Sequence, residues 1–570
     1  MIEWKRAEMP RQWFRGWRCW VLLALVPGVA ALMAAHLAGS AVSPIWFELK
    51  PIAFRHENGE DPGRRQAPAT MAGGVAILDY NRDGRPDIFF TNGARLATLR
   101  KDDPKFYNRL FRNDGNGVFT DVTEKAGLTG VGYDEGVAVA DYDNDGYPDI
   151  FVAGLHHNTL YHNNGDGTFT DVTAKAGIKN QPDPQYGPLW AVGAVWVDVN
   201  NDGLLDLFVV NYMKWDYANE PRCVYKGDPE YCDPRLYGAT PNQLYLNQGN
   251  GTFKDVSEEW GIRAHAGKGM SASMADYDLD GFPDIFVPND TEYNFLFHNV
   301  GGKKFEEVAF PMQVALPEDG VFISGMGSDF RDYNNDGYPD IVFVALERQT
   351  FPIFKNIGGK RFEEVTAASG MRSACWPMAG YGPAFYDLDN DGWKDLFVTR
   401  GDVLSLPMPG GMVNQPNTVF RNLGPSGKWQ ALTAEAGFDA APPARNRGVA
   451  FGDLDGDGRV DIVTTQIDGP AHIWMNRSPG GNHWLDIALE GTKSNRDGIG
   501  ARIKVTTKSG AQYNHMTTAV GYASSSDGPV HFGLGADAKA DSVEVHWPSG
   551  IVQTLKDVRG DQVLKVKEAQ

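Results

Sequence analysis

The sequence has few cysteines and fewer basic than acidic residues. Its 570 residues include 53 Lys and Arg against 73 Asp and Glu, and the formal net charge is −20 at pH 7. This balance argues against nucleic acid or an anionic membrane surface as a partner. Of only four cysteines, Cys223 and Cys232 lie nine positions apart in one segment. We expect a disulfide between them in an oxidising compartment, with two unpaired thiols as the alternative.

The short motifs of common catalytic and nucleotide-binding sites are also absent. The sequence contains no Gly-x-Ser-x-Gly nucleophile elbow, no Walker loop, no Rossmann fingerprint and no Cys-x-x-Cys-His haem site. No catalytic residue is therefore assigned. His156, His157 and His162 match no standard zinc spacing, and surface or hydrogen-bonded histidines are the preferred interpretation.

The N-terminal segment contains a long apolar run. Cys19 to Gly39 is almost wholly apolar and follows a segment rich in Lys and Arg. This length suits a membrane span of ~20 residues, and the basic flank predicts a cytoplasmic N-terminus with the rest exported. Residues 1–45 are thus predicted to be a basic tail and transmembrane anchor. A cleavable signal peptide is the alternative, because small residues cluster at 38–41. In both cases the bulk lies in the periplasm or outside the cell.

The most informative stretch is an aspartate-rich nonapeptide, Asp141-Tyr-Asp-Asn-Asp-Gly-Tyr-Pro-Asp149. Side-chain oxygens at positions 1, 3, 5 and 9 lie close together on a tight loop, Gly146 permits the turn, and position 7 offers its backbone carbonyl. Ca²⁺ accepts six to eight such hard oxygen ligands. An EF-hand would have helical flanks and a Glu at position 12, whereas both flanks here have the composition of strands. The stretch therefore predicts a metal-binding β-hairpin.

The nonapeptide occurs seven times, with starts separated by 55 to 78 residues, which indicates a repeat architecture with up to seven Ca²⁺. Positions 1, 3, 5, 7 and 9 of the copies are Asp79, Asn81, Asp83, Arg85, Asp87; Asp141, Asp143, Asp145, Tyr147, Asp149; Asp198, Asn200, Asp202, Leu204, Asp206; Asp276, Asp278, Asp280, Phe282, Asp284; Asp332, Asn334, Asp336, Tyr338, Asp340; Asp387, Asp389, Asp391, Trp393, Asp395; and Asp453, Asp455, Asp457, Arg459, Asp461.

Each repeat has a second half with its own hairpin signal. Asn158–Asn163 leads into Gly165–Phe169 and then Thr170–Gly177, with an Asn-x-Gly-x-Gly turn between two short strands, and similar halves follow most other copies. Four antiparallel strands per repeat make one blade of a β-propeller. The last copy is followed by a single clear strand, Ala471–Met475, so we expect Ile52–Gly59 to supply its closing strand.

The repeats resemble the FG-GAP/VCBS repeats of integrin α-subunit propellers and their bacterial relatives. The tail motifs Asn482-His-Trp-Leu485, Ser494–Arg502, His531–Gly535 and Val545–Gly550 resemble the ASPIC/UnbV domain. Together they are similar to the cartilage acidic protein 1 family. This resemblance implies an all-β fold, with an integrin α-like seven-bladed β-propeller at 46–480 and a small β domain at 481–570. It implies calcium binding outside the cytoplasm and no established reaction.

Loop lengths predict which face of the propeller binds a ligand. The long insertions, 212–240 and 401–416, follow the second strand of their repeats and therefore lie opposite the Asp loops. Aromatic residues in the first insertion suit a contact surface, although packing against the propeller is the alternative. These are Tyr212, Trp215, Tyr217, Tyr225, Tyr231 and Tyr237. The residue five positions before each loop is Gly in six copies and Ser271 in the other, so the inner strands can crowd around the axis.

Polar residues at the ends of the inner strands are candidates for ligand contacts at the mouth of the channel, with an ordinary polar rim as the alternative. They are Glu135, Asn211, Asn289, Asp290, Arg400 and Arg447. The sequence therefore predicts a membrane-tethered, calcium-binding propeller that acts as a binding or adhesion module for a protein or carbohydrate. An accessory subunit of a membrane complex and an exported carbohydrate-active enzyme are the alternatives.

Overall fold

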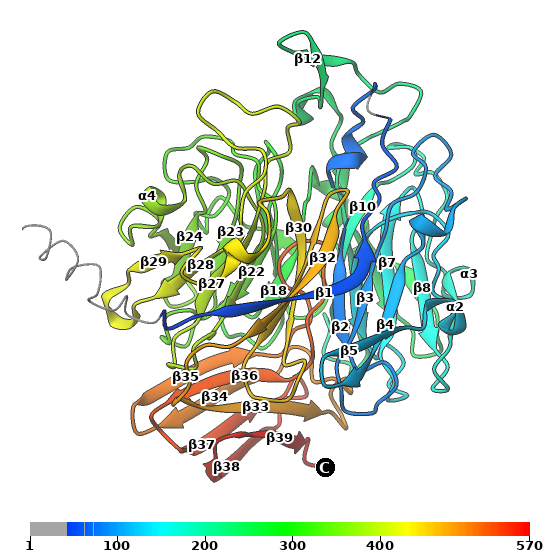
Figure 1. Ribbon diagram of the computed structural model, residues 1–570. Coiled ribbons are helices and arrows are strands. Elements are labelled where there is room, and N and C mark those ends of the chain that lie inside the picture. Colours follow the sequence, from blue (N-terminus) through cyan, green and yellow to red (C-terminus); the bar gives the residue numbers. More distant parts are fainter. Residues whose placement is uncertain (1–42, 62, 72) are drawn as a thin grey trace, which may run out of the picture. The chain divides into compact units, whose positions relative to one another are not determined.

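The computed structural model describes residues 43–570 except 62 and 72, and most of its regular structure is β-strand (Figure 1). The predicted anchor or signal peptide, with Cys19, lies outside the described residues. Within the described part of the chain, no helix combines the length and apolar composition needed to cross a membrane. The all-β fold predicted from the sequence is confirmed.

Seven four-stranded antiparallel sheets lie between residues 47 and 476, and we number them in chain order. Sheet 1 contains β2 (Val75–Leu78), β3 (Asp87–Phe90), β4 (Arg109–Gly115) and β5 (Val118–Asp121). Sheet 2 contains β6 (Tyr133–Ala140), β7 (Asp149–Leu155), β8 (Thr159–Asn163) and β9 (Phe169–Asp171). Sheet 3 contains β10 (Ala191–Val197), β11 (Asp206–Asn211), β15 (Gln243–Asn247) and β16 (Phe253–Asp255). Sheet 4 contains β18 (Ser273–Ala275), β19 (Asp284–Val287), β20 (Phe295–Asn299) and β21 (Phe305–Glu307).

The remaining sheets follow the same order. Sheet 5 contains β22 (Ser328–Arg331), β23 (Asp340–Phe343), β24 (Ile353–Asn356) and β25 (Phe362–Glu364). Sheet 6 contains β26 (Gly380–Tyr386), β27 (Asp395–Arg400), β28 (Thr418–Asn422) and β29 (Trp429–Leu432). Sheet 7 contains β30 (Asn446–Gly452), β31 (Asp461–Gln466), β32 (Pro470–Asn476) and β1 (Phe47–Arg55). This repetition of four-stranded antiparallel sheets is consistent with a β-propeller.

Short elements connect the sheets. Two small two-stranded sheets pair β12 (Cys223–Tyr225) with β13 (Asp228–Glu230) and β14 (Thr240–Pro241) with β17 (Ala266–Gly267). The short helices are α2 (Thr123–Ala126), α3 (Thr173–Ala176), α4 (Met371–Cys375), η1 (Ala67–Thr70), η2 (Pro104–Phe106), η3 (Pro234–Leu236), η4 (Ile262–Ala264), η5 (Gly424–Ser426) and η6 (Phe438–Ala440).

The N-terminal strand closes sheet 7, as the sequence predicts. β1 runs antiparallel to β32, with Phe47 opposite Asn476. It begins at Phe47 rather than at Ile52 and ends at Arg55, because the chain then turns and His56 donates its backbone N–H to the Gly469 carbonyl at 2.9 Å. The outer edge of sheet 7 is thereby covered by sequence from the other end of the repeats.

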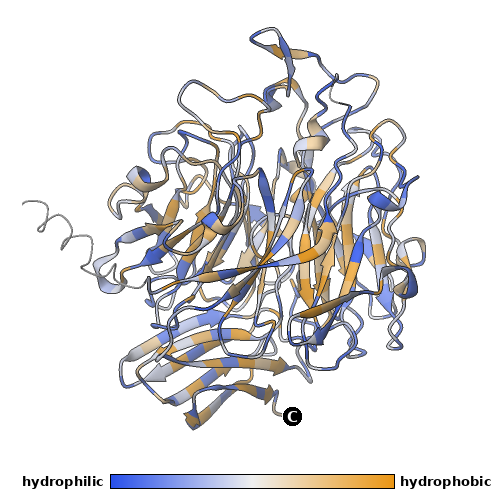
Figure 2. Ribbon diagram, viewed as in Figure 1, coloured by the Kyte–Doolittle hydropathy of each residue, from blue (hydrophilic) through white to orange (hydrophobic). Residues whose placement is uncertain are grey.

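The first strands of the sheets face one another through small residues. Successive first strands are in contact from β2 to β30, and β30 contacts β2 in turn. A Cβ on Gly136 would lie 2.3 Å from the Val192 carbonyl oxygen of the next sheet, and one on Gly448 would lie 2.3 Å from the Gly73 oxygen. The predicted crowding of inner strands is therefore confirmed. Outside this ring of contacts, the hydrophobic residues concentrate in the strands of the sheets (Figure 2).

The tail forms two further sheets. One contains β36 (Val530–Gly535), β33 (His483–Glu490) and β39 (Gln562–Lys567), with β39 parallel to β33. The other contains β35 (Gly510–His515), β34 (Arg502–Thr507), β37 (Lys539–His546) and β38 (Val552–Arg559). The connection between β35 and β36 does not stay with these sheets but reaches the first strands of the repeats.

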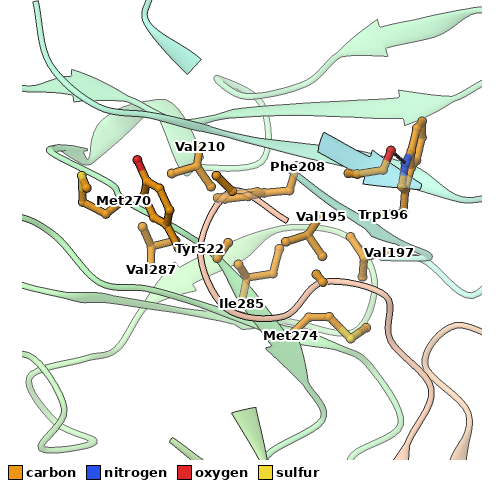
Figure 3. Packing of buried hydrophobic residues seen from close by; sticks show 14 of the residues in the cluster. Val195, Trp196, Val197, Phe208, Val210, Met270, Met274, Ile285, Val287 and Tyr522 are labelled. Atoms are coloured by element: carbon orange, nitrogen blue, oxygen red, sulfur yellow. Dashed lines mark hydrogen bonds between the residues drawn. The ribbon is translucent and has the colours of Figure 1, made fainter. Parts of the chain in front are cut away.

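We call residues 517–528 the central segment, because they bond to inner strands of several sheets. Val137 donates its backbone N–H to the Ala523 oxygen at 3.0 Å, and Ser525 exchanges backbone hydrogen bonds with β2. The Ser524 hydroxyl oxygen accepts from the N–H of Val449 in β30 at 3.1 Å. Figure 3 shows Tyr522 among apolar side chains of sheets 3 and 4, including Met270 and Val287. The tail thus supplies hydrogen-bond partners to backbone groups on the inner edges of the sheets, which would otherwise be unpaired.

Candidate functional site

All seven nonapeptides connect the first strand of a sheet to the second, and we call the face that they share the loop face. In each, the position-6 glycine donates its backbone N–H to the first aspartate at 2.7–3.0 Å. Asp145 also donates its N–H to Asp141 at 3.0 Å. These bonds fold the loop so that its carboxylates point inward. The glycine has a positive φ, 98° at Gly146, which side chains rarely allow.

The last aspartate of each loop is buried at the start of the second strand. One of its oxygens accepts from the backbone N–H of position 2, and the other from an asparagine N–H in the third strand at 2.6–2.8 Å. Burial is the main reason that the pKa of Asp149 rises to about 7 and that of Asp87 to about 8. Ionised carboxylates at this depth need a compensating cation.

Carboxylates at positions 1, 3 and 9 converge in the same loops. In the loops of sheets 2, 4 and 6, one oxygen from each of these three side chains lies within 4.8 Å of the others. The clusters are Asp141, Asp143 and Asp149; Asp276, Asp278 and Asp284; and Asp387, Asp389 and Asp395. These three clusters offer only oxygen, which fits Ca²⁺ rather than a softer metal, although His162 and His298 also lie close to Asp143 and Asp278 in two of these loops. The residues present therefore fit the ion that the sequence predicts.

Some loops have a histidine or arginine side chain beside the carboxylates. The Nδ1 atom of His162 lies 3.2 Å from the Asp149 carboxylate, and His298 lies 3.0 Å from Asp284. Arg421 donates to Asp389 and Asp391, both at 2.8 Å, in the loop of sheet 6. His162 is thus neither a zinc ligand of a known motif nor a solitary surface histidine. His162 lies at the loop because of the pairing register of the third strand. The spacing of the histidines in the sequence does not reveal that register.

An asparagine at the end of each third strand joins neighbouring sheets. Its side-chain N–H₂ donates at 2.7–3.0 Å to the carbonyl of loop position 2 in the preceding sheet, and sheet 1 is joined to sheet 7 in the same way. The seven residues are Asn113, Asn163, Asn247, Asn299, Asn356, Asn422 and Asn476. In the sequence these asparagines mark only a hairpin turn. The Asn-x-Gly pattern that six of the seven share was the available signal.

Loss of one such asparagine is expected to destabilise the protein. Asn247→Ala removes the bonds to the Tyr142 and Leu205 carbonyls, at 2.8 and 3.1 Å, and leaves buried oxygens without donors. We expect a loss of about 3 kcal/mol in the free energy of unfolding, measured by denaturant titration. Asn250→Ala in the exposed turn is the control and should change it by less than about 1 kcal/mol. Equal effects of the two variants would contradict this role.

The predicted ligand-contact residues at the mouth are all buried. Glu135, Asn211, Asn289 and Arg447 are 0% exposed, Asp290 is 2% exposed and Arg400 is 4% exposed. They do not form an exposed rim, because the central segment and the insertion cover them.

Two of these residues lie near the tyrosine of the central segment. Burial and then the nearby Glu135 raise the pKa of Tyr522, and Arg447 lowers it, so both charged groups lie close to this ring. The Arg447 guanidinium lies 3.6 Å from the centre of the Tyr381 ring and donates to the Thr70 carbonyl at 2.7 Å. Glu135 and Arg447 are therefore both fully buried, and each lies near Tyr522.

The other four candidates bond to residues outside the inner strands. Asp290 accepts from the Tyr212 hydroxyl at 2.7 Å, and Asn211 donates to the Pro241 carbonyl at 2.9 Å. Asn289 donates to the Tyr293 carbonyl, and Arg400 donates to Gln415 at 3.0 Å. Each of these four side chains thus holds a loop in place.

The insertion aromatics mainly pack rather than form a surface. Tyr212, Trp215, Tyr231 and Tyr237 are between 3% and 8% exposed, and the Trp190 ring lies 5.0 Å from that of Tyr212. The contact-surface interpretation is therefore wrong for these four, and the packing alternative holds. Cys223 and Cys232 are joined by a disulfide beside the β12–β13 hairpin. Figure 1 shows this hairpin at the far end from the tail sheets.

Two family models match the sequence. A model described as FG-GAP-like repeat matches residues 79–152, 141–209, 235–287, 277–343, 332–398 and 400–464. A model described as ASPIC and UnbV matches residues 491–570. The matches cover the same regions as the repeat and tail motifs.

Curated relatives include cartilage acidic protein 1 of two mammals. The sequence is 26% identical to the Homo sapiens protein over 499 residues, which is 85% of this chain and 70% of the human protein. It is 28% identical to the Mus musculus protein over 362 residues, which is 62% of this chain and 51% of that protein. The chain thus spans about half the length of the mouse relative.

Similar solved structures share little sequence with this chain. BBS1N in complex with ARL6DN aligns with a TM-score of 0.42 at 10% identity, over 77% of this chain and 98% of that one. An Agrocybe aegerita lectin that recognises terminal N-acetylglucosamine aligns with a TM-score of 0.38 at 16% identity, over 70% of this chain and 87% of that one.

Proposed function

We propose that this chain, which belongs to the family of FG-GAP-like repeat proteins, is a calcium-stabilised, seven-bladed β-propeller that binds a protein partner. The partner binds on the face opposite the Asp loops, which we call the insertion face. It consists of the connections between second and third strands and between consecutive sheets. The observation that carries this proposal is the distribution of exposed apolar side chains.

Support for seven blades comes from two closed series of contacts. First strands touch in sequence and return from β30 to β2. The third-strand asparagines likewise join each sheet to its predecessor, ending with Asn113 of sheet 1 on the Leu454 carbonyl of sheet 7 at 2.9 Å. A ring that closes through both series has no open blade edge.

Support for calcium comes from the loop chemistry. Positions 1, 3, 5 and 9 would hold the ion through side-chain oxygens and position 7 through its carbonyl. When bound, the ion supplies the positive charge that the buried carboxylates otherwise lack. Chelation followed by a thermal melting curve tests this.

Exposed apolar side chains support the choice of face. Of the 15 large apolar residues that are exposed in the described chain, ten lie in connections of the insertion face. They are Val131, Val224, Leu236, Tyr293, Phe310, Val321, Phe322, Trp376, Met408 and Met412. The rings of Phe310 and Phe322 each lie within 4.7 Å of the Tyr293 ring, so three aromatics form one exposed cluster. Clustered aromatic area of this kind is typical of protein interfaces.

The loop face is less suited to a partner because the tail covers much of it. Arg496 donates its N–H to Asn144 at 2.7 Å, and Asp497 accepts from Asp141 at 2.8 Å. His531 lies 2.7 Å from the Asn390 side chain. The tail thus bonds directly to the loops of sheets 2 and 6.

Crosslinking from defined positions tests the proposed face. We would place p-benzoylphenylalanine at Phe322 on the insertion face, or at Val552 in the tail as a control of similar exposure, and irradiate cells that make the protein. A discrete protein adduct is expected from position 322 only. Phe310→Ser should reduce its yield without changing the thermal midpoint by more than a few degrees. An adduct from position 552 alone, or none from either position, would contradict the proposal.

We also propose that the protein acts outside the cytoplasm, tethered through the apolar segment 19–39. The Cys223–Cys232 disulfide supports this, because such bonds persist mainly in oxidising compartments.

A further inference from the structure

Neighbouring Asp loops are joined by a side chain at position 4. At five junctions this residue donates to the carbonyl of the position-6 glycine in the next loop, as Asn201 does to Gly281 at 2.8 Å. The five pairs are Arg82 and Gly146, Asn144 and Gly203, Asn201 and Gly281, Asn335 and Gly392, and Asn390 and Gly458. All five donors have φ between 56° and 61°, a conformation that asparagine tolerates.

The junction between sheets 4 and 5 breaks this pattern. Leu279 occupies position 4 there with a φ of 62°. Leucine is uncommon in this conformation and has no group that can donate to the Gly337 carbonyl. The bridge is therefore absent at this junction, and an apolar side chain stands in its place.

A cavity of about 240 Å³ lies at this same junction. Its walls include Leu279, Gly337 and Pro339 from the loops, and Lys504 and Tyr513 from the tail. Leu279, Pro339 and the Tyr513 ring provide apolar surface. The repeats and the tail thus form the cavity together, and neither part alone would form it.

Two cations, Lys504 and Arg502, lie in the cavity wall. Among the described residues, Lys504 has no carboxylate within 4.0 Å, and the nearest carboxylate to Arg502 is Asp276 at 3.8 Å. The acidic groups of the wall are otherwise engaged: Glu544 lies 2.7 Å from His546, and Asp332 accepts the Gly337 N–H at 2.7 Å. Positive charge is therefore available to a ligand in a protein whose net charge is −20.

We propose that this cavity binds a small organic anion with a flat apolar body. The body lies between Leu279, Pro339 and the Tyr513 ring, and the anionic group meets Lys504 and Arg502. Apolar walls with a few convergent polar groups are typical of small-molecule sites. The site lies on the loop face and is independent of the protein partner proposed for the insertion face.

Binding of naphthalene-2-carboxylate, measured by isothermal titration calorimetry in calcium, tests the site. The neutral naphthalene-2-carboxamide serves as the comparison ligand. We expect the carboxylate to bind more tightly. Lys504→Gln should weaken the carboxylate at least fivefold and leave the amide unchanged, whereas Lys508→Gln in the adjacent exposed turn should affect neither.

The decisive variant is Leu279→Asn, which gives this junction the residue found at four others. An asparagine amide that reaches the Gly337 carbonyl would replace the apolar Leu279 wall with a polar bridge, so binding of both probes should fall at least tenfold. The thermal midpoint should stay equal or rise, which shows that the loop remains intact. The proposal is overturned if wild type binds neither probe, or if Leu279→Asn binds both as wild type does.

Discussion

Chelation of calcium is expected to lower the thermal midpoint of this protein by roughly 10 °C or more, and calcium should restore it. An ion that binds only the folded state adds ~2.7 kcal/mol at 100 times its dissociation constant, and up to seven loops contribute. The structure explains the size of the effect. Asp149 and its six equivalents are at most 1% exposed, and without a cation their ionised forms oppose folding.

A single-loop variant separates metal binding from folding. Asp143 at position 3 is largely free of backbone bonds, its only such bond being a long one of 3.4 Å from Asp145. Asp143→Ala should reduce the number of calcium ions counted by native mass spectrometry by one, and lower the midpoint only when calcium is present. Asp166→Ala, in the exposed turn of the same sheet, is the control. An unchanged melting curve after chelation, with no metal in the untreated protein, would refute calcium binding.

The features that the sequence predicts correctly are local and repeated. The Asp-x-Asp/Asn-x-Asp-Gly pattern fixes a loop within nine residues, and its flanks alternate or cluster apolar residues in ways that specify strands. The closing role of β1 also follows, because sheet 7 otherwise lacks a fourth strand. Its bounds shift by several residues, because pairing with β32 depends on a register that only the partner strand defines.

The features that the sequence does not reveal depend on distant contacts. The sequence around Tyr212 and Trp215 is the same whether these side chains face solvent or pack. They pack because Trp190 and Asp290, from other connections, contact them. The central segment consists mostly of small residues around Tyr522, a composition that suggests only a loop. Its place among the inner strands is decided by hydrogen bonds to β2, β6 and β30.

These contacts also explain why the candidate residues at the mouth stabilise the structure. Glu135 and Arg447 lie at the strand ends, but both are fully buried and Tyr522 of the central segment lies near them. A polar side chain at a predicted channel is thus informative about function only once the occupant of the channel is known. In this chain the occupant is its own tail.

Replacing Gly136 by alanine is expected to destabilise the protein far more than the same change at Gly193. The two glycines hold the same position in adjacent sheets, and neither has a positive φ. A Cβ on Gly136 would lie 2.3 Å from the Val192 oxygen and 2.9 Å from the Gly193 Cα, and backbone atoms of a packed strand cannot move aside cheaply. The nearest atom to a Cβ on Gly193 is the Ala523 Cα at 3.9 Å, an ordinary contact. We expect Gly136→Ala to cost about 3 kcal/mol or more, and Gly193→Ala to change stability by less than about 1 kcal/mol. Denaturant midpoints in saturating calcium measure the difference, and equal midpoints would show that the inner strands are not held at the distances described.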